Sequence, residues 1–110
     1  MNQHQSTGSL SKALCTQVNQ IKWEDIPETV KREAKRSMVN FFAVAFAGSA
    51  DPTIEKTIRA YARFSAGHTA LILGRTERTD MLNAAALNAM SANVYDFDDT
   101  HLKTIIHPTA

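Results

Sequence analysis

The chain has 110 residues, of which 44% are hydrophobic and 21% charged, a composition typical of one ordinary globular domain and not of a disordered protein. Its formal net charge is +1, and its basic residues alternate with acidic ones, which argues against a nucleic-acid-binding protein. The densest basic stretch, 31–36, is interrupted by Glu33, so we interpret it as a solvated helix face.

The cysteine content and the apolar segments indicate where the protein resides. The single cysteine, Cys15, cannot form an internal disulfide, which fits a reducing compartment, and we expect it to be a small core residue. Residues 1–9 lack the apolar segment of a signal peptide, and the longest apolar run, 41–47, is too short to span a membrane. We therefore expect a soluble, cytoplasmic protein that binds neither nucleic acid nor membrane.

The first helix is predicted from a repeat of apolar residues. Residues 1–8 are polar and are expected to form a disordered N-terminus, and Ser9 is a candidate N-cap. The following apolar residues recur at three- and four-residue steps, which places them on one helix face. They are Leu10, Ala13, Leu14, Val18 and Ile21.

A second helix is predicted from Pro27 to Ala47. Proline disfavours a helical conformation at the residue before it but fits the first turn of a new helix. The last part of this helix, 41–47, is apolar on every side, so we expect it to be buried on every side. Gly48 is expected to follow the helix as its left-handed C-terminal residue.

Asp51 and Pro52 are expected to begin a third helix, as its cap and its first helical residue, and Gly67 to lie near its end. Residues 68–73 are predicted to form a short extended segment that Gly74 closes, with His68 in a loop. A polar turn follows at 75–78.

Thr79 or Asp80 is expected to cap a fourth helix, from Met81 to about Val94. Its expected packing face is made of small residues, so another helix can approach closely. This face consists of Leu82, Ala85, Ala86, Ala89 and Ala92. The sequence therefore predicts an all-α, mainly helical fold over residues 9–110, with about four helices and one short extended segment.

The polar groups with chemical potential are concentrated directly after this fourth helix. Three carboxylates, a hydroxyl and two imidazoles fall within twelve residues, as proton transfer, metal binding or recognition of a polyanionic small molecule would require. They are Asp96, Asp98, Asp99, Thr100, His101 and His107.

Three interpretations of this cluster remain open on chemistry alone. In the structural one, Asp98 and Asp99 cap a turn and Asp96 pairs with a basic residue. In the second the cluster holds a metal ion, although the spacing matches no regular ligand pattern. In the third, Asp96, Thr100 and His107 bind a small carboxylate or transfer protons.

Considered as a whole, the sequence resembles the MmgE/PrpD family, which includes 2-methylcitrate dehydratase and cis-aconitate decarboxylase. The resemblance extends over about residues 10–110, and its most specific part is the acidic, threonine and histidine stretch. The residues that carry it most clearly are Asn88, Ala92, Asp96-Phe-Asp-Asp-Thr-His101 and His107-Pro108.

The resemblance implies a lyase of small di- or tricarboxylic acids that uses neither metal nor cofactor and is usually a homodimer. In the family, residues matching Asp96, Thr100 and His107 line the active site. Asp96 and Thr100 would position the substrate, whereas His107 would bind a carboxylate or assist proton transfer. His101 is a further substrate-binding candidate of lower rank, because it varies more among relatives.

Members of the family are several times longer than 110 residues and take further active-site groups from segments absent here. We therefore expect the chain to be the opening part of a larger enzyme, with little or no activity alone. Three alternatives stay open: a non-catalytic helical interaction module, an isomerase or epimerase of a dicarboxylic acid, and a metal-dependent hydrolase.

Overall fold

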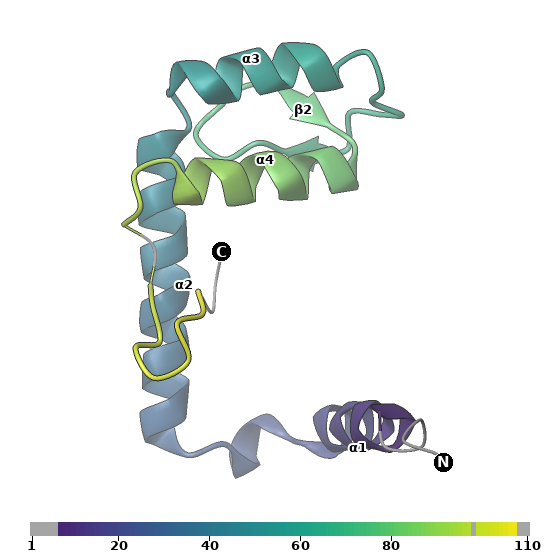
Figure 1. Ribbon diagram of the computed structural model, residues 1–110, viewed down its shortest axis with the longest axis vertical. Coiled ribbons are helices and arrows are strands. Elements are labelled where there is room, and N and C mark those ends of the chain that lie inside the picture. The colour runs from purple at the N-terminus through teal and green to yellow at the C-terminus, as the bar shows by residue number, and fades with distance from the viewer. Residues whose placement is uncertain (1–6, 98, 108–110) are drawn as a thin grey trace, which may run out of the picture. The chain divides into compact units, whose positions relative to one another are not determined.

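The computed structural model describes residues 7–97 and 99–107, and within them it contains four α-helices, a short 3-10 helix and two short strands (Figure 1). The mainly helical fold predicted from the sequence is confirmed. Two compact units, Met1–Glu33 and Ala34–Ala110, are described separately below. The elements in chain order are α1 (Thr7–Gln20), η1 (Trp23–Asp25), α2 (Glu28–Gly48), α3 (Pro52–Tyr61), β1 (Ala70–Leu71), β2 (Arg78–Thr79) and α4 (Met81–Asn93).

The first unit contains α1, the 3-10 turn and the beginning of α2. The apolar residues predicted to share one face of α1 are exposed, from Leu14 at 53% to Val18 at 71%, and Cys15 is exposed rather than in a core. Lys31 is the buried exception in the basic stretch that was expected to be solvated. Its amine donates to Glu28 Oε1 at 2.8 Å and lies 5.2 Å from the Trp23 ring centroid, a cation–π contact.

In the second unit, α2 is buried on one face only. Val44 and Ala45 pack against Ala92 of α4, whereas Phe42 is 40% and Phe46 53% exposed. The expectation that 41–47 is buried on every side is therefore wrong for the described residues. The neighbouring elements cover one side of α2, and an apolar composition alone does not supply a partner for the other side.

The joint between α2 and α4 depends on a glycine. A Cβ atom added to Gly48 would lie 2.0 Å from the backbone oxygen of Ser91 and 2.8 Å from a methyl carbon of Val94. Gly48 is thus the last helical residue of α2, and not the left-handed residue expected after the helix. Its lack of a side chain lets α2 and α4 approach closely. Ser91 is itself buried, and its hydroxyl donates to Leu87 O at 2.9 Å.

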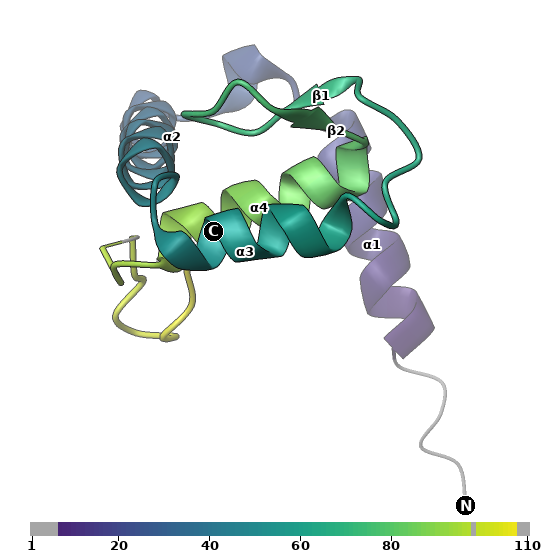
Figure 2. The same cartoon turned by 90° about the horizontal axis from the view of Figure 1, so that it is seen from above.

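Helices α3 and α4 lie side by side with the hairpin against them (Figures 1 and 2). The predicted start of α3 is confirmed, because the Asp51 carboxylate accepts from the Thr53 N–H at 2.7 Å and Pro52 is the first helical residue. The helix ends at Tyr61, six residues before the expected end. Its core with the hairpin and α4 is formed by Ile54, Ile72 and Leu87, with Ile58, Tyr61 and Met90 around them.

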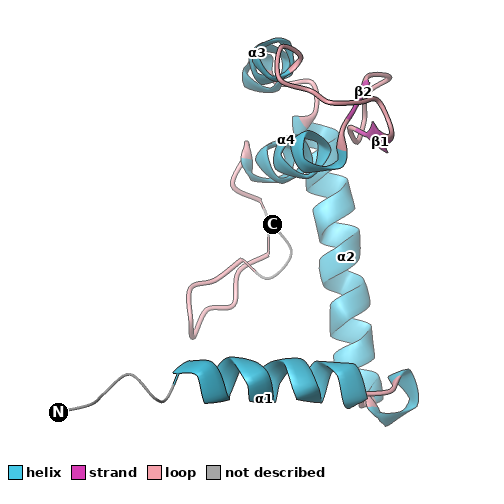
Figure 3. Ribbon diagram, turned by 90° about the vertical axis from the view of Figure 1, so that its right-hand side faces the viewer, coloured by secondary structure: helices cyan, strands magenta, loops and turns pink. Residues whose placement is uncertain are grey.

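The predicted extended segment is one strand of a hairpin, which Figure 3 shows in magenta. β1 pairs antiparallel with β2, with Ala70 opposite Thr79. Gly74 has a φ of 73°, and a Cβ there would lie 2.2 Å from the Ser49 hydroxyl oxygen, so both conformation and space favour glycine. The Asn88 side chain accepts from the Leu73 N–H at 2.8 Å and donates to Leu71 O at 3.2 Å.

Arg75 in the hairpin turn connects three parts of the second unit. Its guanidinium donates to Ser49 O at 3.2 Å and to Glu77 Oε1 at 2.6 Å, and it also pairs with Glu55 of α3. The hydrogen bond from Arg75 lowers the pKa of Glu77 to about 2. The pKa of Glu55 is lowered as well, chiefly by its bond with Arg59 and then by Arg75.

The fourth helix starts as predicted but faces its neighbours differently. Its N-cap is Asp80, whose carboxylate accepts from the N–H groups of Leu82 and Asn83 at 3.0 Å, and the bond from Asn83 is the main cause of a lowered Asp80 pKa. Of the expected packing face, Leu82 is 83% exposed and Ala92 is buried as predicted, and the other buried residues are Ala84, Leu87 and Ser91. Within the described part of the chain, every helix is too short or too polar to cross a membrane.

Candidate functional site

The candidate site begins where α4 ends. Val94 is the C-cap, and the chain turns so that the Asp96 N–H donates to Asn93 O at 3.0 Å. Asp96 has a φ of 56°, in the left-handed region that aspartate tolerates better than most residues. Its side chain is exposed. The carboxylate is therefore presented to solvent by a tight turn and not held inside a core.

Phe97, the residue after Asp96, is hydrogen-bonded to α2. The Asn40 side chain donates from its amide nitrogen to Phe97 O at 3.3 Å, and the Tyr95 and Phe97 rings lie 6.4 Å apart. This is a long-range bond, between residues 57 positions apart, and it holds the segment that carries Asp96. Of the two other aspartates in the cluster, Asp99 is half-buried, and Asp98 lies outside the described residues, so the prediction that Asp98 caps a turn stays untested.

Thr100 and His107 are brought together by a closed loop. The His101 N–H donates to Ile106 O at 2.9 Å, which makes an antiparallel bridge between these two residues. Thr100 and His107, the residues directly outside the bridge, place Oγ1 and Nδ1 3.5 Å apart. Both side chains are exposed. At 3.5 Å this is a long hydrogen bond, and it places the two polar groups side by side.

The four site residues predicted from the sequence thus fall into three positions. Thr100 and His107 form a pair, Asp96 lies in the turn after α4, and the His101 ring nitrogen Nδ1 lies 2.7 Å from Thr104 Oγ1 inside the loop. Among residues 7–97 and 99–107, no three His, Cys, Asp or Glu side chains lie close enough together to hold a metal ion.

Comparison with known proteins identifies the family. The MmgE/PrpD N-terminal domain matches residues 12–110. The chain belongs to the MmgE/PrpD family. It is also 27% identical over 100 residues to the cis-aconitate decarboxylase-like protein oryM of Aspergillus oryzae, and the match covers 91% of this chain but 21% of that protein. No solved structure matches the chain.

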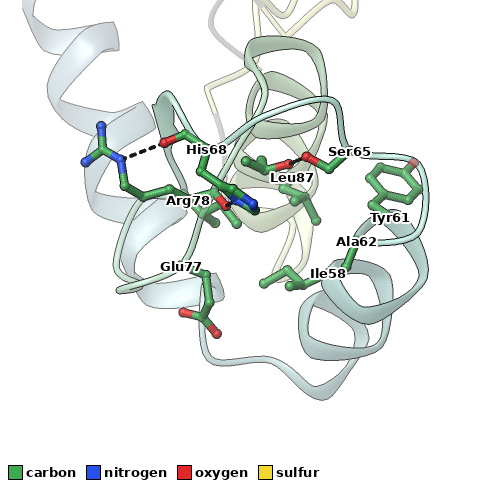
Figure 4. A pocket seen from close by; sticks show the side chains of 10 residues that line it. Ile58, Tyr61, Ala62, Ser65, His68, Glu77, Arg78 and Leu87 are labelled. Atoms are coloured by element: carbon green, nitrogen blue, oxygen red, sulfur yellow. Dashed lines mark hydrogen bonds between the residues drawn. The ribbon is translucent and has the colours of Figure 1, made fainter.

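This MmgE/PrpD chain also has a small apolar pocket of about 50 Å³, shown in Figure 4, between α3, the hairpin and α4. His68 lines this pocket and lies in a loop, as predicted. Its Nδ1 donates to Arg78 O at 2.9 Å. The Ser65 hydroxyl donates to Gly67 O and bonds Thr79 Oγ1 at 2.8 Å. The side chains of Ser65, His68 and Thr79 therefore bond within the fold, and the pocket lining includes none of the four predicted site residues.

Two residues that matter to the site were missed by sequence reasoning, and the structural role of a third residue, at the hairpin, was not foreseen. Asn40 was read only as part of a helix, and its bond to Phe97 spans a distance that no local pattern encodes. Thr104 bonds His101 three residues earlier, and a polar pair at this spacing in a turn is a local signal that could have been used. Asn88 was quoted for the family resemblance, but its role as a fastener of the hairpin was not foreseen.

Proposed function

We propose that this chain is part of an MmgE/PrpD-type lyase, a dehydratase or decarboxylase, that acts on a small di- or tricarboxylic acid such as cis-aconitate or 2-methylcitrate. The observation that carries the proposal is the adjacency of Thr100 and His107 in a chain of this family. The printed name of the Aspergillus oryzae relative, cis-aconitate decarboxylase-like, supports the substrate class. The chain spans about one fifth of that relative, so the activity is proposed for a whole protein that carries this sequence.

Each residue has a role that follows from its chemistry. The Thr100 hydroxyl and a protonated His107 nitrogen both donate hydrogen bonds, and 3.5 Å between them lets both reach one substrate carboxylate. Asp96 is exposed on the turn after α4 and can accept from a substrate hydroxyl or take a proton next to a carboxylate. Removal of a proton next to a carboxylate, or loss of carbon dioxide, develops enolate-like charge, which cationic groups from other segments of the protein would stabilise.

The setting of this enzyme is also proposed. The large apolar residues exposed on α1 and α2 would be covered in a larger protein, in which we expect a homodimer. The free, exposed Cys15 suits a reducing compartment such as the cytoplasm. The same exposed surface is what a helical interaction module would present, so turnover and not fold distinguishes the two functions.

The test is turnover of cis-aconitate and 2-methylcitrate by the natural protein that carries this sequence. We expect wild-type activity, and at least a hundredfold loss of kcat/KM in H107Q and in D96N, the range that removal of an acid–base group typically costs. H68Q is the matched histidine control and should retain activity, because His68 stands at the separate pocket. The isolated 110 residues should show little or no turnover.

Two outcomes would contradict the proposal in different ways. Absence of turnover of either acid, and of related dicarboxylates, by the wild-type protein would reject the lyase and favour the interaction module. Activity that survives both H107Q and D96N would keep the lyase but reject this site.

A further inference from the structure

We propose that His101 and Thr104 form a clasp that sets the distance between Thr100 and His107, so that His101 is a positioning residue and does not touch the substrate. The inference rests on the proposed function for the role of the pair, but the clasp itself can be tested without any substrate. It differs from the sequence-based expectation, in which His101 was a substrate-binding candidate.

The clasp between His101 and Thr104 lies among the short-range hydrogen bonds of residues 101–106. His101 O accepts from the Thr104 N–H at 3.1 Å and from the Ile105 N–H at 2.8 Å, and the His101 N–H donates to Ile106 O at 2.9 Å. The side chains add a further bond, since His101 Nδ1 and Thr104 Oγ1 lie 2.7 Å apart. His101 therefore takes part in four of these contacts, through its N–H, its carbonyl and its ring.

These bonds matter to the loop because its large apolar side chains are exposed. Leu102 is 86% and Ile105 79% exposed, so apolar burial contributes little to its conformation. Ile105 also has a φ of 52°, a left-handed conformation that costs a β-branched residue about 1–2 kcal/mol. The local hydrogen bonds must offset that cost if the ends of the loop are to stay together.

The antiparallel bridge separates the roles of the histidines. His101 and Ile106 are directly opposite each other, so Thr100 and His107 form the next pair along the two segments. Successive side chains of extended segments point to opposite faces, and opposed residues share a face. Thr100 and His107 therefore share one face of the two bridged segments, and His101 lies on the opposite face. From there His101 can fix the positions of the pair without contacting the substrate.

The distance that the clasp sets has a functional consequence. Two donors that bind one carboxylate must stay within a few tenths of an ångström of their positions, and displacement by about 1 Å can cost a hundredfold in rate. An exposed loop without the clasp would sample many separations between Thr100 and His107. We therefore expect the clasp to raise kcat/KM without contributing a group to the reaction.

The first test uses two substitutions at Thr104 that separate the hydroxyl group from the rest of the side chain. T104V keeps the shape and removes the hydroxyl, whereas T104S keeps the hydroxyl. In NMR spectra of the 110-residue chain, we expect nuclear Overhauser contacts between the Thr100 methyl group and the His107 ring in wild type and in T104S, but not in T104V. Equal contacts in all three chains would overturn the clasp.

The second test asks whether His101 positions or reacts, and it uses the natural protein with cis-aconitate. Asparagine can place an amide nitrogen or oxygen near the position of the imidazole Nδ1, so H101N should recover most of the activity lost in H101A, with the pH profile of wild type. T104V should lower kcat/KM about tenfold, and T104S should restore it to within about twofold of wild type. H101N as inactive as H101A would instead place the imidazole in contact with the substrate, and would overturn the proposal.

Failure of the inference and failure of the proposed function give different results. If the wild-type protein turns over no carboxylic acid, the lyase proposal fails, and the contacts between Thr100 and His107 in the T104V and T104S chains still decide whether the clasp exists. If turnover is present but T104V leaves both the NMR contacts and kcat/KM unchanged, the lyase stands and the clasp is rejected.

Discussion

Two parts of the second unit, Gly48 to Asn93 and Val94 to His107, are held by different kinds of bonds. From Gly48 to Asn93, side chains join residues far apart in the sequence: Asn88 bonds Leu73, and Arg75 bonds both Ser49 and Glu55. From Val94 to His107, the backbone hydrogen bonds of residues 101–106 are local, and Asn40 supplies a long-range fastening at Phe97. The first part is a scaffold whose elements fix one another, whereas the second carries the candidate chemistry on an exposed loop.

The largest effect should come from breaking the scaffold at its closest contact. Gly48→Ala places a Cβ 2.0 Å from the Ser91 backbone oxygen, and neither helix can yield without moving the core between them. We expect a loss of about 3 kcal/mol or more in the free energy of unfolding, measured by urea titration. Gly67→Ala is the matched control, because a Cβ at Gly67 meets nothing within 4 Å. Equal stability of the two variants would disprove the close joint.

A smaller effect should follow from removing one carboxylate of the scaffold's ion pairs. The folded-state pKa of Glu77 is about 2, below its ordinary value of 4.5, so its contribution to stability is present above about pH 4.5 and is lost as the pH falls towards 2. Because Glu77 is partly exposed, we expect E77Q to cost no more than about 1 kcal/mol at pH 6. Thermal unfolding at pH 6 and pH 2 measures it: the difference between wild type and E77Q should shrink at pH 2. A difference independent of pH would mean that the charge of Glu77 plays no part.

The smallest effect on global stability should come from I105N, which relieves the backbone strain at Ile105 in the loop. Asparagine tolerates the left-handed region better than isoleucine, so I105N should close the loop more firmly and change the free energy of unfolding by less than about 0.5 kcal/mol. Hydrogen exchange of the His101 amide, which bonds Ile106 O, should slow about twofold. I106N is the control, since the φ of Ile106 is not positive. Faster exchange in I105N would show that the isoleucine side chain holds the loop.

The sequence was sufficient for most helix starts, because these depend on local chemistry, although α1 begins at Thr7, before the N-cap expected at Ser9. Pro27, Asp51 with Pro52, and Asp80 mark helix starts that the structure confirms within one residue. Caps and first-turn prolines act within three or four residues, so a single sequence shows them. The family resemblance likewise rested on residues that lie close together in the sequence, above all the stretch from Asp96 to His101, and the match over residues 12–110 confirms it.

Burial and long-range bonding could not be predicted in the same way. The apolar run 41–47 gave no sign that Phe42 and Phe46 would be exposed, because exposure depends on which partner is present. The packing face of α4 was only partly predicted, with Ala92 buried as expected, for a related reason: apolar residues occur on nearly all sides of this helix, so periodicity cannot choose among them. For the site, the sequence indicated the polar residues, but the pairing of Thr100 with His107 required the loop conformation.

The Asn88 fastening has a consequence for association between chains. The carbonyl of residue 71 and the N–H of residue 73 point to the same side of β1, and a residue of an added parallel strand would bond both. The Asn88 amide already occupies both groups, with its oxygen on one and its nitrogen on the other. A two-stranded hairpin would otherwise offer this edge to any extended peptide and so promote aggregation. One asparagine on a neighbouring helix therefore takes the place of a third strand and keeps the edge closed while the protein stays folded.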